Sequence, residues 1–227
     1  MGTADRAPAR WAWSCLRLAT AAAIVAAIAV TLSASREAWA TAAYADLGAL
    51  WVNFFSYFTV LSNLAAAVVL TVGAVAVVRL RGAEPAWWSQ VRICVAVYMG
   101  ITGLVYNLLL RGIAVTGGGD TPEWPNEVLH VIGPLVLVLD WLFAPGRTPI
   151  AWKRIGVILA FPIVWTAYTL IRGSHVVDQV RGRPTWYPYP FLDPDNGGYL
   201  AVSGWVVLIA AAFAGVAALL IWSSRRW

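Results

Sequence analysis

Long apolar blocks alternate with shorter polar stretches along the 227 residues of the chain. The six blocks run from about Cys15 to Leu32, Trp51 to Val78, Val91 to Leu110, Glu127 to Phe143, Ile155 to Ile171 and Tyr199 to Trp222. About 20 apolar residues in a helix cross the hydrocarbon core of a bilayer, and a helix pairs its own backbone polar groups within lipid. The pattern therefore predicts an all-α integral membrane protein with six transmembrane helices.

The composition excludes a soluble domain. Hydrophobic residues make up 60% of the chain and charged residues only 12%, whereas soluble domains carry about 25% charged residues. The net charge of +5 would suggest nucleic-acid binding in a soluble protein. Here the basic residues fall in the polar stretches, where they set orientation in the membrane. We therefore expect one membrane domain, residues 15–222, surrounded by membrane lipids and without a nucleic-acid partner.

Basic residues are distributed unequally between alternate polar stretches. Eleven of the 16 fall in or beside residues 1–14, the second-to-third and fourth-to-fifth connections, and the tail 223–227, and five fall on the other side. Because cytoplasmic loops carry the excess of Lys and Arg, both termini are predicted to be cytoplasmic. The long aromatic loop 173–198 is then external. We expect the plasma membrane of a bacterium as the location.

The first apolar block also has features of a signal peptide. It begins with arginine and is followed by Ala38-Trp39-Ala40, which resembles a small-residue cleavage site. We expect the span to be retained, because several polar residues separate this site from the apolar run. Cleavage would leave the remaining topology unchanged, so the charge pattern does not decide between the two.

Polar side chains inside the apolar blocks are candidates for function, because they are costly in lipid unless paired. In the second block they recur at steps of three and four residues, which puts them on one helical face. At 1.5 Å per residue, Thr59 lies about 12 Å and His130 about 6 Å below the external surface. We expect both to face a cavity in the outer half of the bundle. The candidate residues are Asn53, Ser56, Thr59, Asn63, Asn107, Glu127, His130 and Tyr168.

Each candidate also has a structural interpretation. Thr59 taken alone is typical of a packed helix interface, where its hydroxyl bonds to backbone. For His130, chemistry and a structural hydrogen bond both stay open. Glu127 lies near the interface, where water could solvate it, and Asp140 is expected to extend toward water at the inner end of its helix. His130 and His175 are the two histidines and neither has a second His or Cys at helical spacing, so no metal or cofactor is expected.

Three short motifs occur in a telling order: residues 57–63 (YFTVLSN), residues 126–130 (NEVLH) with Pro134 after them, and residues 189–192 (YPFL) before the final helix. They resemble the androgen-induced-gene and androgen-dependent TFPI-regulating protein family of six-helix membrane threonine hydrolases. The resemblance implies that Thr59 is a nucleophile, that His130 is its partner, and that the substrates are esters of fatty acids with hydroxy fatty acids. The family's amide or acid after the threonine occurs here one residue later, at Asn63.

This chemistry is physically reasonable, because a hydroxyl becomes a useful nucleophile when a nearby imidazole takes its proton. Asn53, Ser56 or Asn63 would donate to the oxyanion, and Asn107, Glu127 and Tyr168 would complete the pocket. Two other classes stay open. The same cavity could bind or transport a small amphiphile without chemistry, or the polar face could serve only for helix packing in a structural or accessory membrane protein.

Overall fold

The computed structural model describes residues 7–79, 82–113 and 122–226. The elements in chain order are α1 Ala7–Ala42, α2 Leu47–Ser56, α3 Phe58–Arg79, α4 Ala86–Val105, the π-helix η2 Tyr106–Leu110, α5 Glu123–Glu127, the π-helix η3 Val128–Ile132, α6 Gly133–Phe143, the 3-10 helix η4 Trp152–Arg154, α7 Ile155–Gly173, the 3-10 helices η5 Pro190–Leu192 and η6 Pro194–Asn196, and α8 Gly198–Ser224.

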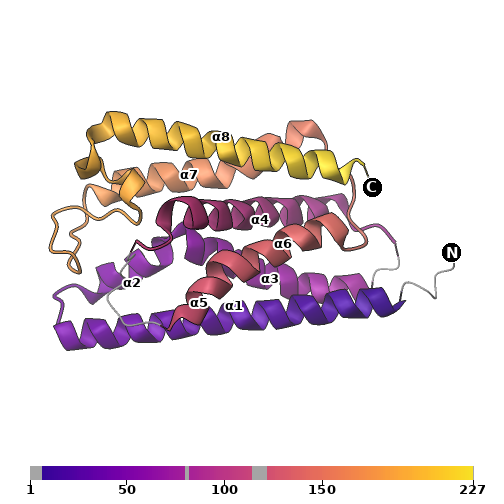
Figure 1. Cartoon of the computed structure of the whole chain (residues 1–227), viewed down its shortest axis with the longest axis horizontal. Helices are drawn as coiled ribbons and strands as arrows, with labels where there is room; N and C mark the ends of the chain where they lie inside the picture. Colours follow the sequence, from indigo (N-terminus) through magenta and orange to yellow (C-terminus); the bar gives the residue numbers. More distant parts are fainter. Residues whose placement is uncertain (1–6, 80–81, 114–121, 227) are drawn as a thin grey trace.

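Within these residues, six helical stretches are long and apolar enough to cross a membrane. This confirms the predicted all-α fold with six helices that could span a membrane, by their length and composition. Both described ends of the chain lie at the same end of the bundle, as Figure 1 shows. We call this the termini end, and the opposite end, which carries residues 174–197, the loop end. Which end faces the cytoplasm stays a prediction, and residues 1–6 and 227 of the predicted cytoplasmic segments lie outside the described residues.

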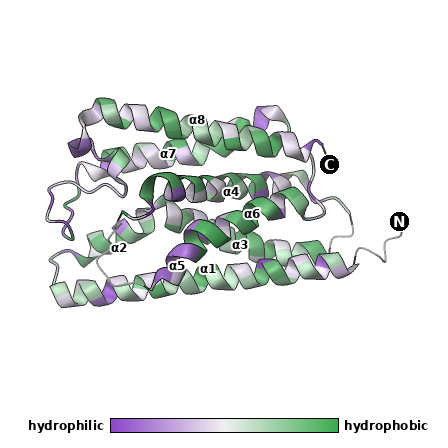
Figure 2. Ribbon diagram, viewed as in Figure 1, coloured by the Kyte–Doolittle hydropathy of each residue, from purple (hydrophilic) through white to green (hydrophobic). Residues whose placement is uncertain are grey.

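The helices form an elongated bundle with α1 along one edge and α7 and α8 along the opposite edge (Figure 1). Helix α4 lies between them and contacts α3, α6, α7 and α8. The hydropathy colouring in Figure 2 shows apolar ribbon along most of the helices and polar residues gathered in α5 and in the loop segments. The lateral surface is therefore apolar, as lipid requires.

Helix α1 is longer than the first predicted span, because it continues to Ala42 without a break. The residues after Leu32 include good helix formers and contain no Gly or Pro to stop the helix. Its last turns pack in the protein at the loop end, where the Trp39 side chain is buried and lies edge-on to Trp51. Hydropathy located the apolar part of α1 but not its extension.

The second predicted span is divided into two helices. Helix α2 ends at Ser56, Tyr57 adopts an extended conformation (φ −65°, ψ 131°), and α3 begins at Phe58. The sequence contains no Gly or Pro at this point, so the break has no local signal. Its cause is tertiary, since α2 is hydrogen-bonded to α7 while α3 packs along α1 and α4.

Candidate functional site

An apolar cavity of about 360 Å³ lies among α4, α7 and α8, next to the start of α3. Residues 174–197, which we call the loop-end segment, contribute Tyr189, Phe191 and Leu192 to its wall. Most of its wall is aliphatic or aromatic. The polar side chains on the wall lie mainly in its loop-end half and carry hydroxyl groups. They are Thr59, Thr102, Tyr106, Thr166 and Tyr189, together with the indole of Trp165. The cavity thus has one end with hydrogen-bonding groups and one apolar end.

Thr59 reaches this wall because of the break at Tyr57. It is the second residue of α3, and the first N–H groups of a helix have no partner within the helix. The Thr59 backbone N–H donates to the Tyr189 hydroxyl oxygen (3.2 Å), and Thr59 Oγ1 lies 3.2 Å from the same oxygen. The loop-end segment therefore holds the amino end of α3 through one phenol.

Tyr189 is a neutral hydrogen-bonding partner for Thr59. Burial raises the pKa of its phenol above the ordinary value, and the hydrogen bonds with Thr59 offset this only in part. A phenol that keeps its proton at neutral pH is a poor general base. Tyr189 can orient the Thr59 hydroxyl, but it cannot take its proton.

His130 lies in the π-helix η3 and does not line the cavity. Its imidazole stacks on the Tyr106 ring, with centroids 4.1 Å apart and planes at 23°. Nδ1 lies 3.0 Å from the Asn126 carbonyl oxygen, and because a carbonyl oxygen only accepts, Nδ1 is the donor in this hydrogen bond. Among the described residues, Thr59 and His130 share no hydrogen bond, and the Tyr106 ring, which does line the cavity, lies against the imidazole.

The Tyr106 hydroxyl has a hydrogen-bond partner on α5. It accepts a hydrogen bond from Asn126 Nδ2, which leaves its own proton free to donate. Tyr106 belongs to the π-helix η2, and η2 contacts η3. A π segment inserts an extra residue into a turn and is frequent at functional sites. Neither π segment has a signal in the sequence that we identified.

Asn63 and Asn107, both predicted for the pocket, satisfy backbone carbonyls around the π segments. Asn63 Nδ2 donates to the carbonyls of Thr59 (2.9 Å) and Leu129 (3.1 Å), and Asn107 Nδ2 donates to those of Gly103 (2.8 Å) and His130 (3.3 Å). A π segment disturbs the regular helix ladder, so its carbonyls need such partners. Both amides lie outside the cavity wall.

Polar contacts join α2 to α7. They include three more residues that were predicted for the pocket: Asn53, Ser56 and Tyr168. Ser56 Oγ lies 2.8 Å from the Tyr168 hydroxyl, and Asn53 Oδ1 accepts from Arg172 (2.8 Å). The Ser56 carbonyl accepts from the Trp165 indole (2.9 Å). None of the three predicted residues lines the cavity. Asn53 and Ser56 lie on α2, before the break at Tyr57, whereas Thr59 lies on α3 after it.

Glu127 is in a surface ion pair at the loop end. Its carboxylate lies 3.2 Å from Arg111, and both side chains are more than 40% exposed (Arg111 49%, Glu127 42%). An exposed pair of this kind contributes little to stability. Of the eight predicted site residues, the structure thus places Thr59 on the cavity wall, His130 behind Tyr106 and the other six elsewhere.

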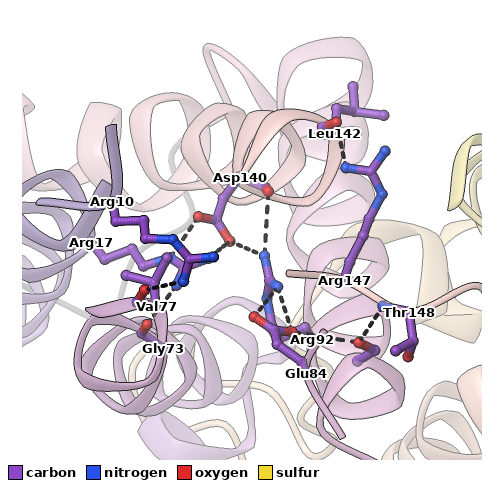
Figure 3. A network of polar contacts seen from close by, with 11 residues as sticks. Arg10, Arg17, Gly73, Val77, Glu84, Arg92, Asp140, Leu142, Arg147 and Thr148 are labelled. Carbon is purple, nitrogen blue, oxygen red and sulfur yellow. Dashed lines mark hydrogen bonds and ion pairs between the residues drawn. The ribbon is translucent and has the colours of Figure 1, made fainter. Parts of the chain in front are cut away.

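A buried charge network at the termini end was missed by the sequence reasoning. Figure 3 shows Asp140 of α6 between two arginines, Arg17 of α1 and Arg92 of α4, and Arg92 also pairs with Glu84. All four side chains are at most 5% exposed. Asp140 was expected to extend toward water, and this is wrong: two guanidinium groups bind it inside the bundle. The two positive and two negative charges balance.

The charge network is structural in character because its hydrogen bonds are internally satisfied. Arg17 also donates to the Gly73 carbonyl (2.5 Å) and Arg92 to the Asp140 carbonyl (3.3 Å). A buried ion pair repays its desolvation only when such additional bonds are made. The network connects α1, α3, α4 and α6 with the segment before α4, at the end of the bundle opposite the cavity's hydroxyl groups.

No family model, curated protein or solved structure significantly matches this chain. Among the described residues, no three His, Cys, Asp or Glu side chains gather as a metal site would require. Assignment of function therefore depends on the cavity and the residues around it.

Proposed function

We propose that this protein binds an amphiphile with an acyl chain inside the membrane, in the cavity among α4, α7 and α8. The observation that supports this proposal is the polarity of the cavity wall, which is mostly apolar and bears hydroxyl groups around Thr59. The volume of about 360 Å³ lies at the lower end of the range for small-molecule sites, which combine an apolar lining with a few convergent polar groups.

The long axis of the cavity follows the helices. Its wall includes Leu159 and Leu170 of α7, and at 1.5 Å per residue these positions are separated by about 16 Å along the helix. An acyl chain lying along this axis would place its polar group beside Thr59 and Tyr189 and its tail beside Leu159 and Phe213. We propose that the loop end is external and that the location is a bacterial cell membrane, as the distribution of basic residues predicts.

Hydrolysis of a lipid ester is the second candidate, and one observation favours it: Thr59, which carries the proposed nucleophile, lines the cavity. In this mechanism Thr59 Oγ1 attacks the carbonyl carbon, and His130 Nε2 accepts the hydroxyl proton and returns it to the departing alkoxide. Water then hydrolyses the acyl-threonine, releasing the fatty acid. For the oxyanion donor we propose the Tyr106 hydroxyl, because Tyr106 lines the cavity and the predicted Asn53, Ser56 and Asn63 do not.

The position of the Tyr106 ring makes binding the better supported of the two. For His130 to take a proton from Thr59, the Tyr106 ring has to rotate or a water has to connect the two groups. Binding needs neither. A structural or accessory role remains the outcome if the cavity takes no ligand.

Photolabelling tests the binding proposal. The purified protein is placed in phosphatidylcholine vesicles with hexadecanol that carries a diazirine in its chain, and labelled peptides are mapped after illumination. We expect labels on cavity-lining segments of α4, α7 and α8. Ile209→Trp, which fills the cavity, should abolish these labels, and Val207→Trp, an exposed position outside the wall, should retain them. Labels confined to exposed lipid-facing positions would contradict binding in the cavity.

Ester hydrolysis is tested separately, with the same vesicles and a fatty-acid ester of a hydroxy fatty acid. Activity in the unaltered protein that is lost in both Thr59→Ala and His130→Ala supports the threonine mechanism. Thr71→Ala is the matched control, because Thr71 is exposed on α3 and bonds only to its own helix. Full activity in both site variants would exclude this mechanism and leave the binding proposal intact.

A further inference from the structure

Buried side chains cover the cavity on the sides that face the protein interior. At the loop end, Tyr189 and Leu192 cover it, and both are buried (6% and 2% exposed). Elsewhere on the wall, Phe58 and Phe213 are buried and pack against each other with ring centroids 5.7 Å apart. Among the described residues, the side chains that cover the cavity at these two places are therefore aromatic or aliphatic and buried.

The loop-end cover is itself held in place. Arg183 pairs with Asp193 (3.0 Å), and Asn196 donates to the Pro190 carbonyl (3.0 Å). Tyr189 stacks on Phe191 with ring centroids 5.2 Å apart, and Phe191 also lines the cavity. Because these contacts hold the segment in place, we interpret it as a fixed cover of the cavity rather than an entrance.

Exposed side chains on the wall are found on α7 and α8. Ile163 is 64% exposed, and Ala167 and Ala210 are also exposed, although all three line the cavity. Ile163 and Ala167 lie one turn apart on the same face of α7. Side chains that touch both the cavity and the outside of the bundle mark an opening. We call it the α7–α8 window.

We infer that the cavity is loaded sideways from the lipid bilayer through the α7–α8 window, and that its ligand is a single-chain amphiphile with an uncharged polar group. The inference rests on the proposed binding function and adds the route of entry and the ligand class. The window opens midway along α7 and α8, so hydrocarbon rather than water lies outside it in a membrane.

The chemistry of the wall selects the polar group. The residues around the cavity include no Asp, Glu, Lys, Arg or His among the described part of the chain. A charged group brought there would lose its hydration without gaining a counter-ion, which is strongly unfavourable. Alcohols, esters and amides, in contrast, are matched by the hydroxyls of Thr59, Tyr106 and Tyr189. A volume at the lower end for ligand sites suits one chain rather than two.

Order of addition tests the window. In a Cys15→Ala, Cys94→Ala background, Ala167→Cys and Ala210→Cys are joined by a flexible bis-maleimide with a cleavable centre, in vesicles with the diazirine hexadecanol. Probe added after cross-linking should label the cavity about tenfold less than probe added before it. The cross-link blocks entry through the window but does not prevent a probe that is already inside from being bound and labelled. Cleavage of the linker should restore labelling. The single variant Ala210→Cys treated with the same reagent is the control.

Equal labelling in the two orders of addition would overturn the window while leaving binding intact, whereas absence of cavity labels in the unaltered protein would overturn the binding function itself. If the cysteine pair does not fold or cross-link, Ala210→Trp provides the second test. It should slow labelling relative to Ala211→Trp, an exposed neighbour that does not line the cavity, and equal rates would also overturn the window.

Competition tests the ligand class. Hexadecanol should compete with the probe and hexadecyl sulfate should not; equal competition would overturn the uncharged ligand class.

Discussion

Arg17 and Asp140 form a bidentate ion pair across the bundle, although 123 positions separate them in the sequence. Arg17 Nε lies 2.7 Å from Asp140 Oδ1, and Arg17 donates a second hydrogen bond to Oδ2 at 3.1 Å. The pair links α1 to α6 between helices that are long and apolar enough to span a membrane. It makes α1 part of the folded protein and gives Asp140 a role that its position near a helix end did not suggest.

The first prediction concerns the charge network. Asp140→Ala should destabilise the fold by about 3–5 kcal/mol, because it leaves Arg17 buried without its carboxylate and Arg92 with one partner instead of two. Thermal unfolding of the purified protein in detergent measures the effect. Glu127→Ala is the matched control, and since its ion pair with Arg111 is exposed, its loss should cost no more than about 1 kcal/mol. Similar losses in the two variants would contradict the structural role of the network.

The second prediction concerns the fate of α1. The protein isolated from membranes should retain the residues before Ala40, because α1 continues as a helix through Ala38-Trp39-Ala40 and the Trp39 side chain is only 4% exposed. Cleavage there would also remove Arg17 from Asp140. The intact mass and the amino-terminal sequence of the purified protein measure this. A mature chain that begins at Thr41 would show instead that the first span is a signal peptide.

The third prediction concerns the loop-end segment. Gly173 ends α7 against residues 186 and 187, and a Cβ at this position would lie 2.6 Å from the Trp186 carbonyl oxygen, closer than backbone can accept. Gly173→Ala should therefore displace the segment and cost about 1–3 kcal/mol. Limited proteolysis should cut residues 174–197 faster in this variant. Gly204→Ala is the control, since no atom lies within 4 Å of its added Cβ; unchanged cleavage in Gly173→Ala would contradict the tight packing.

The fourth prediction concerns Tyr189 and its partner Thr59. Tyr189→Phe leaves the Thr59 backbone N–H without an acceptor and should cost about 1–3 kcal/mol. Thr59→Ala keeps that hydrogen bond and should cost less. Thermal unfolding of the two variants compares them. A larger loss in Thr59→Ala would show that the side-chain contact, and not the amino end of α3, is the important one.

The fifth prediction concerns alkaline pH. Burial raises the pKa of Tyr189 in the folded protein above the ordinary value of 10.0. Below pH 10 the phenol is protonated in both states, so it adds no pH dependence. Above that value the unfolded chain releases the proton while the folded protein keeps it, and the free energy of unfolding falls. Between about pH 9 and about pH 11, Tyr189→Phe should lose less stability than the unaltered protein. Equal losses would mean that the phenol is not buried.

The pattern of apolar residues determined the six spans, because each span is a local property. A run of about 20 apolar residues is helical in lipid whatever its neighbours are, since backbone groups have no other partners there. The same reasoning singled out Thr59, which lines the cavity. It did not detect the extension of α1, because the residues after Leu32 are more polar, or the break at Tyr57, because neither Gly nor Pro marks that position.

The tertiary structure decided which polar groups meet. Asn53, Ser56 and Thr59 share a face of an ideal helix, but hydrogen bonds to α7 break that helix and separate the first two from the third. The Tyr106 ring lies against His130 because two π segments contact each other, and Asp140 is paired because α1 and α4 both pack beside α6. Contacts of this kind depend on how distant helices pack, and spacing along one helix carries no record of the partner it will meet.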